Sequence, residues 1–196
     1  MPYPEFKAML DLLAMLFFDW RTGMLILLLT GAAVCDYRTH RIPNWLVLSG
    51  ALFGVIYNTA LPPSPHDNIL FPLAGLGLGL LLFLPLYLMR AMGAGDVKLL
   101  AMVGALLGPG EAFHAALASV VVGSVLSILF VLVRGTARRM YYNLVSLFQL
   151  ALLGALAGSA PSLRITAGAS AGKLPYGVAI AIGTIGYLIL HQLGFL

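Results

Sequence analysis

Apolar residues along the chain form several long runs that are separated by short polar segments. These runs do not alternate with the two-residue period of a transmembrane barrel strand. Backbone polar groups inside lipid must be hydrogen-bonded within their own segment, so each long run predicts a transmembrane helix. We predict about six such helices, at approximately Trp20–Cys35, Pro43–Leu61, Ile69–Met89, Asp96–Leu107, Ala112–Val133 and Pro175–His191.

Two of these predicted helices are short for a membrane span. Trp20–Cys35 would be roughly 24 Å long, and Asp96–Leu107 requires a thinned membrane or a start inside a cavity. Pro43 suits the first turn of the second helix, because its ring fixes the backbone there. Small residues spaced for close helix packing also occur in the third and fourth helices. They are Gly75, Gly77, Gly79, Gly104 and Gly108.

Two further segments do not fit simple spans. In Phe6–Phe18, Lys7 and Asp11 interrupt the apolar residues, which is typical of a helix lying on the membrane surface. Tyr141–Leu156 carries polar residues at three-residue spacing, near one helix face. This segment can span, re-enter or lie on the membrane, and the sequence leaves the three alternatives open.

Composition supports the membrane interpretation. The chain has 196 residues, of which 61% are hydrophobic and 9% charged, whereas a soluble domain has about a quarter charged residues. The chain has a net charge of +4. Its basic residues do not line one helical face, so we expect no nucleic-acid partner. We predict a single membrane-embedded domain, residues 1–196, in contact with the lipid bilayer.

Charge also predicts an orientation. With six spans and the N-terminus outside, most basic residues fall on the inner side, as the positive-inside rule requires. They are Arg38, Arg41, Arg90, Lys98, Arg134, Arg138, Arg139, Arg164 and Lys173. This arrangement favours an inner, cytoplasmic Tyr141–Leu174 segment.

Under this topology two acidic residues, Asp36 and Asp96, fall on the inner side, at helix ends of similar depth. Ionisable groups near the hydrocarbon are candidates for function. Two carboxylates about 3 Å apart cannot both ionise, so they share a proton and can activate water against a peptide carbonyl. The alternatives are that Asp36 is a polar loop residue and that Asp96 caps the fourth helix.

Other catalytic chemistries have little support. The chain has a single cysteine, Cys35, so a CxxC zinc site is not possible within it, and its four histidines show no metal-binding spacing. HExxH is absent from the sequence. We therefore expect no metal and no cofactor.

Three segments stand out as motifs, namely Asp36–Asn44, Gly93–Leu99 and Leu174–Gly183. In these segments the sequence resembles the type IV prepilin peptidase family, membrane aspartic proteases with a GxGD motif. Asp36–Asn44 (DYRTHRIPN) is similar to the family's pattern of an Asp, basic residues and Ile-Pro-Asn. Gly93–Leu99 (GAGDVKL) is similar to GxGDxKL at every position. Leu174–Gly183 (LPYGVAIAIG) is a weaker match to the family's last span.

The resemblance implies a peptidase that removes the leader from prepilins at the cytoplasmic boundary of the bacterial inner membrane, as a multi-pass protein. It implies Asp36 and Asp96 as the catalytic pair. Gly93 and Gly95 form a bend without side chains, and we expect it to let the substrate backbone approach the acid.

Three other motif residues have more than one interpretation. Lys98 either stabilises the charge near the motif or marks the inner boundary of the membrane. Pro43 and Asn44 are expected to fix the turn into the second helix.

The chain also departs from the long members of the family. It lacks the cytoplasmic insert with paired CxxC motifs and methyltransferase activity, so it resembles the short Tad/Flp pilus peptidases. Archaeal preflagellin peptidases are similar as well. The alternative from another class is a small transporter or scaffold in which the two aspartates bind a proton or a cation. The sequence leaves the particular prepilin, the oligomeric state and the protonated aspartate open.

Overall fold

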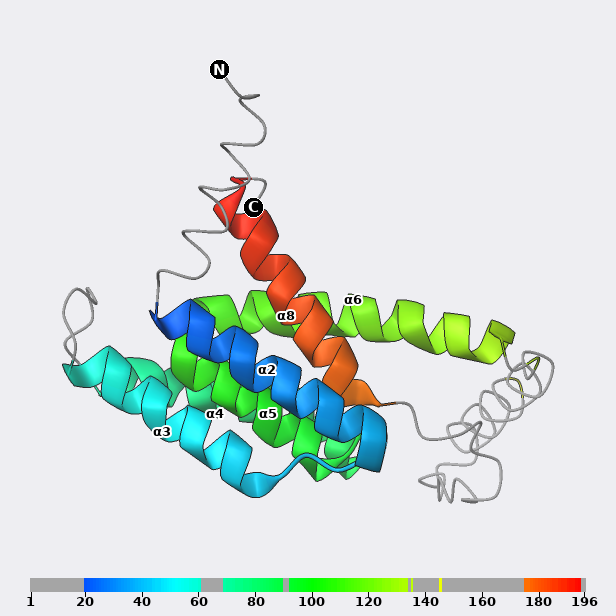
Figure 1. Cartoon of the computed structure of the whole chain (residues 1–196), viewed down its shortest axis with the longest axis horizontal. Helices are drawn as coiled ribbons and strands as arrows, with labels where there is room; N and C mark the ends of the chain where they lie inside the picture. Colours follow the sequence, from blue (N-terminus) through cyan, green and yellow to red (C-terminus); the bar gives the residue numbers. More distant parts are fainter. Residues whose placement is uncertain are drawn as a thin grey trace, which may run out of the picture. The chain divides into compact units, whose positions relative to one another are not determined.

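The computed structural model describes residues 20–60, 69–89, 92–133, 135, 145 and 175–194. Within these residues the chain is all-helical and contains no strand, which confirms the predicted fold class (Figure 1). The helices are α2 (Trp20–Thr39), α3 (Asn44–Ala60), α4 (Leu70–Leu88), α5 (Ala94–Leu107), α6 (Pro109–Val133) and α8 (Tyr176–Gln192).

The observed helices differ from the predicted ones mainly at their ends. α2 continues to Thr39 instead of ending at Cys35, so its 20 residues make a helix of roughly 30 Å. α5 begins at Ala94 rather than Asp96, and α6 begins at Pro109. The extension of α2 places Asp36 inside a helix.

Two predicted segments, Phe6–Phe18 and Tyr141–Leu156, lie outside the described residues, apart from the single position Val145. The chain divides into two compact units, one of residues 1–123 with 175–196 and one of residues 124–174. The single domain over residues 1–196 stays a prediction. All the site residues discussed below belong to the first unit.

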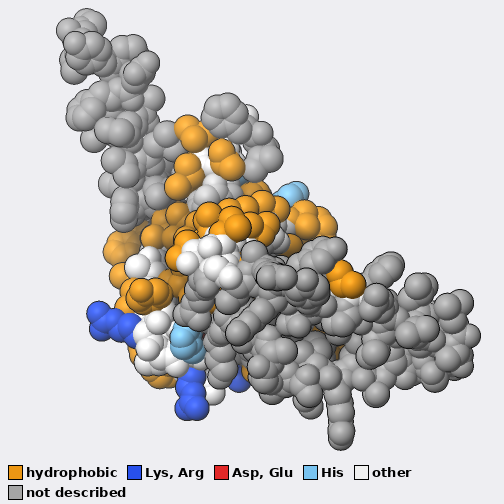
Figure 2. Space-filling model, turned by 90° about the vertical axis from the view of Figure 1, so that its right-hand side faces the viewer, with side chains coloured by type: hydrophobic (Ala, Val, Ile, Leu, Met, Phe, Trp, Pro, Cys, Tyr) orange, Lys and Arg blue, Asp and Glu red, His pale blue; other side chains and the backbone are white. Residues whose placement is uncertain are grey.

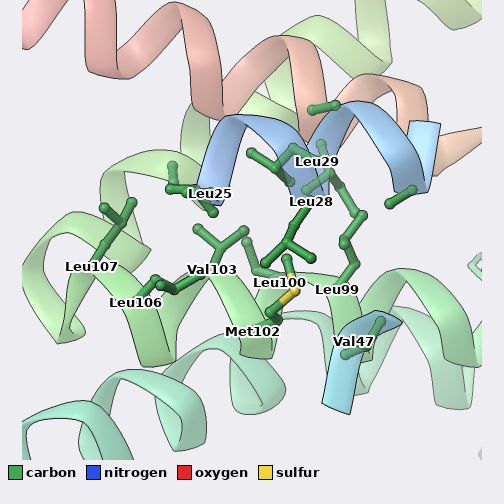
Figure 3. Packing of buried hydrophobic residues seen from close by; sticks show 14 of the residues in the cluster. Leu25, Leu28, Leu29, Val47, Leu99, Leu100, Met102, Val103, Leu106 and Leu107 are labelled. Carbon is green, nitrogen blue, oxygen red and sulfur yellow. The ribbon is translucent and has the colours of Figure 1, made fainter. Parts of the chain in front are cut away.

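α5 is the central helix of the first unit. It contacts α2, α3, α4 and α8, and every residue from Leu99 to Leu107 is buried. Figure 3 shows Leu25, Leu28 and Leu29 of α2 meeting buried side chains of α5. Because other helices cover its surface, α5 needs less length than a helix that must match the bilayer along lipid.

Glycines bring α4 and α5 close together. A Cβ atom on Gly75 would overlap the carbonyl group of Gly104, and one on Gly79 would overlap the carbonyl group of Leu100. Gly77, between them, has open space beside it. The predicted close packing is therefore confirmed for Gly75, Gly79 and Gly104, whereas Gly77 lies away from the contact.

The surface of the helices is strongly apolar. α4 and α6 are long and apolar enough to cross a membrane, and only 22% of the most apolar segment of each is buried. α8 is apolar but shorter. Large hydrophobic side chains such as Leu27, Leu81 and Val121 are more than 60% exposed. In the view of Figure 2, hydrophobic side chains cover most of the described surface, and Lys and Arg side chains gather at its lower edge. A surface of this kind is suited to lipid rather than water.

Candidate active site

Asp36 lies in the part of α2 that faces the protein interior. Leu25, Leu29, Ala32 and Asp36 are all buried, and their spacing of three or four residues places them on one helix face. The same stripe that packs the apolar side chains therefore carries the carboxylate inward. Asp36 is only 6% exposed.

Asp96 lies in the first turn of α5, where Gly93 is the residue that precedes the helix. The backbone N–H of Gly93 donates to Asp96 Oδ2 at 3.0 Å. This bond satisfies one of the free donors at the start of the helix, so Asp96 does have the capping contact that the sequence offered as an alternative. Asp96 is 8% exposed, which is unusual for a carboxylate that serves only as a cap.

The two carboxylates lie on helices that contact each other, although they are 60 positions apart in the sequence. α2 contacts α5, and Asp36 interacts electrostatically with Asp96. Within the described residues, no group of three or more His, Cys, Asp or Glu side chains could hold a metal ion. Two buried carboxyl groups that feel each other's charge titrate as a coupled pair.

Lys98 and Asn44 connect two of the helices that surround this site. Lys98 Nζ donates to Asn44 Oδ1 at 3.1 Å. Asn44 is the first residue of α3 and directly follows Pro43, whose carbonyl accepts a hydrogen bond from Val47 N–H at 3.4 Å. The contact therefore joins the second turn of α5 to the first turn of α3 and fixes the start of α5 beside the turn after α2.

The motif glycines have neighbours within the protein. A Cβ on Gly95 would lie 3.3 Å from Cβ of Ile42, and a Cβ on Gly93 would lie 3.3 Å from Oδ2 of Asp96. The sequence interpretation attributed both glycines to the approach of a substrate backbone. At Gly95 the structure gives another physical reason, since Ile42 from the turn between α2 and α3 packs against it.

The structure shows one contact of the site that the sequence analysis did not predict. The backbone N–H of Gly177, in the first turn of α8, donates to Asp36 Oδ2 at 2.7 Å. α8 packs against α2, and Figure 1 shows α8 beginning beside the last turns of α2. The only sequence signal for this contact was the third segment of family resemblance, which contains Gly177.

The comparison with family models identifies the protein's relatives. The model of the type IV leader peptidase family matches residues 22–128, which is more than half of the chain. The chain belongs to the type IV leader peptidase family. As a member of the leader peptidase family it is a membrane-embedded peptidase. No curated protein and no solved structure matches the chain.

The region matched by the leader peptidase family contains both Asp36 and Asp96. It covers α3, α4 and α5 and most of α2 and α6. It ends before α8, so the contact between Gly177 and Asp36 comes from a part of the chain that the match does not include.

Proposed function

We propose that this protein is an aspartic endopeptidase that removes the leader peptide from prepilins of the Flp type. Asp36 and Asp96 are its catalytic pair, and the reaction needs no metal and no cofactor. The observation that carries the proposal is that two buried carboxylates, one on α2 and one on α5, lie near enough for the charge of Asp36 to act on Asp96. A buried pair of like charges destabilises a protein, and such pairs are typical of functional sites.

The reaction follows from the shared proton. The ionised carboxylate takes a proton from a water molecule, whose oxygen attacks the carbonyl carbon of the scissile peptide bond. The protonated carboxyl group donates its proton to the carbonyl oxygen, which gives a tetrahedral diol. When the C–N bond breaks, a proton passes to the leaving amine. Each carboxylate accepts its backbone hydrogen bond at Oδ2, so we assign the water to the Oδ1 atoms.

The site is suited to a substrate that crosses the membrane boundary. We place Asp36 and Asp96 at the cytoplasmic face of the bacterial inner membrane, in a multi-pass protein with its N-terminus outside. Exposed Arg38, Arg41 and Lys98 lie near the two acids in the sequence, as the positive-inside rule expects for that face. A prepilin has a basic leader followed by an apolar helix, and its junction would meet the pair there.

The test is co-expression of the chain with a Flp-type prepilin, followed by separation of the cleaved and uncleaved substrate. We expect cleavage by the wild-type protein and none by Asp36→Asn or Asp96→Asn, with equal amounts of protein in the membrane. Glu111→Gln is the matched control, because it also exchanges a carboxylate for an amide but lies at the start of α6. We expect it to cleave normally.

Two results would contradict the proposal. Cleavage that survives in both Asn variants would exclude the aspartate pair as the catalytic group. An inactive wild type, with both Flp-type prepilin and preflagellin as substrates, would favour the alternative of a transporter or scaffold that binds a proton or cation.

A further inference from the structure

The first turn of α8 has free backbone donors and obtains a partner from another helix. Pro175 precedes α8, and it provides no side-chain hydrogen bond to the helix start. Helices usually satisfy their first N–H groups with the side chain of a Ser, Thr, Asp or Asn at this position. Here the Gly177 N–H donates to Asp36 Oδ2 instead, in a buried setting. The carboxylate of α2 therefore acts as the cap of α8.

The contact also depends on the absence of a side chain at residue 177. A Cβ on Gly177 would lie 2.9 Å from Asp36 Oδ2 and 3.0 Å from Asp36 Cβ. These distances are too short for ordinary van der Waals contact, and the neighbouring atoms belong to a short side chain on a packed helix. Any side chain at this position would therefore displace the Asp36 carboxylate or push α8 away from α2.

From these two observations we propose that Gly177 is a positioning residue for Asp36. Its N–H holds Oδ2, and its lack of a side chain leaves room for the carboxylate, so that Oδ1 is directed to the reacting water. This inference rests on the proposed catalytic role of Asp36. It adds α8, outside the residues that the family model matches, to the elements that build the active site.

The direct test compares Gly177→Ala with Gly186→Ala in the purified full-length chain, with a synthetic Flp-type prepilin as substrate. Both glycines lie in α8, but a Cβ on Gly186 has nothing within 4 Å, so Gly186→Ala is a matched control. We expect Gly177→Ala to lower kcat by about 100-fold, the order of loss that a 1 Å misplacement causes. KM should stay within about threefold, since uniform binding is unchanged. Gly186→Ala should have wild-type kinetics.

The pH dependence of kcat separates positioning from a loss of folded protein. Loss of folded enzyme lowers the whole pH profile by one factor and leaves its midpoints in place. A displaced Asp36 carboxylate changes the interaction within the pair, so the midpoints of the Gly177→Ala profile should move. An unchanged kcat per folded molecule, or a profile that is only scaled, would overturn the positioning role.

A second measurement does not depend on activity. Thermal unfolding in detergent is compared for wild type, Gly177→Ala, Asp36→Ala and the double variant. Because the predicted conflict is with the Asp36 side chain, Gly177→Ala should lower the unfolding temperature in the wild-type background and have little effect in the Asp36→Ala background. Additive changes would show that the contact is absent and would overturn the inference. The changes in unfolding temperature can be non-additive while Asp36→Asn still cleaves prepilin. In that case the contact between Gly177 and Asp36 is present, and the proposed catalytic role of Asp36 is wrong.

Discussion

α8 meets a carboxylate near each of its ends, and the two carboxylates are held in different ways. At its start, the Gly177 N–H binds Asp36, which has a second carboxylate, Asp96, beside it. Near its other end, Tyr187 Oη donates to Glu111 Oε2 at 2.5 Å. His191 Nε2 lies 3.9 Å from Glu111 Oε1.

The partners at the second end complement the charge of Glu111. A phenol and an imidazole can both donate to a carboxylate, and the ring of His114 stacks on Tyr187 with centroids 5.5 Å apart. We call this set, Glu111, His114, Tyr187 and His191, the Glu111 cluster. It joins α6 to α8 and has the partners expected of a stabilising contact.

The start of α8 has the opposite character. Two carboxylates repel each other, and they are buried at 6% and 8% exposure, where charge is expensive. Two backbone N–H groups compensate only part of this unfavourable energy. Under the proposed function, the Asp36–Asp96 pair serves activity at the expense of stability, whereas the Glu111 cluster serves stability. Substitutions at the two places should therefore have opposite effects on these two properties.

The largest difference is expected between Asp96→Asn and Glu111→Gln. Asp96→Asn should lower the cleavage rate by at least about 10²–10⁴-fold, because general acid–base catalysis contributes that much. Its unfolding temperature should stay the same or rise, since the repulsion with Asp36 is removed. Glu111→Gln should cleave within about threefold of wild type and lose about 1 kcal/mol of stability, as for a hydrogen bond between membrane helices.

These effects are measured by prepilin cleavage with purified protein and by thermal unfolding in detergent. Tyr187→Phe complements the Glu111 substitution, because it removes the donor of this hydrogen bond, whereas Glu111→Gln leaves a weaker, uncharged acceptor. If Asp96→Asn destabilised the protein more than Glu111→Gln did, the contrast between the two places would be wrong.

An intermediate effect is expected for the contact between Lys98 of α5 and Asn44 of α3. Lys98→Met keeps an unbranched side chain of nearly the same length but removes the hydrogen bond to Asn44. We expect kcat/KM to fall about tenfold, which corresponds to about 1.4 kcal/mol. Asn44→Ala should give a similar loss, and the double variant should be no worse than either single variant, because all three remove one contact. Additive losses in this cycle would mean that the two residues act separately.

The smallest effect is expected for His191→Gln. Its contact with Glu111 is long, at 3.9 Å, and half of the His191 side chain is exposed. Exposed ion pairs of this kind contribute about 0–1 kcal/mol, and only when the histidine is protonated. We expect unchanged cleavage and a change in unfolding temperature of less than a degree or two at neutral pH, as measured by the same unfolding assay. A large loss of activity would place the Glu111 cluster in the catalytic reaction.

Much of the fold could be predicted from the sequence. Lipid forces each long apolar run to form a helix, so all six described helices lie where the runs predicted them. The ends were harder to predict, because polar residues can continue a helix when another helix covers them. α2 continues past Cys35, with Asp36 turned toward the interior and Tyr37, Arg38 and Thr39 exposed.

The candidate site was predictable to a different extent. Carboxylates in an apolar chain are rare, so Asp36 and Asp96 were conspicuous as residue types, and the family motif pointed to the same two positions. Gly177 was not predictable in this way, because its contribution is a backbone N–H and an empty space. Every residue except proline has that N–H, so the residue type does not reveal the contact.

The sequence by itself determined the all-helical class, the approximate spans and the two acidic residues, because each of these depends on local composition and on the demands of lipid. The tertiary structure decided which helices meet. It placed α5 at the centre, set Ile42 against Gly95, joined Lys98 to Asn44 and brought α8 to Asp36. These contacts depend on how each helix is rotated and how it crosses its neighbours, and apolar runs of similar composition leave both undetermined.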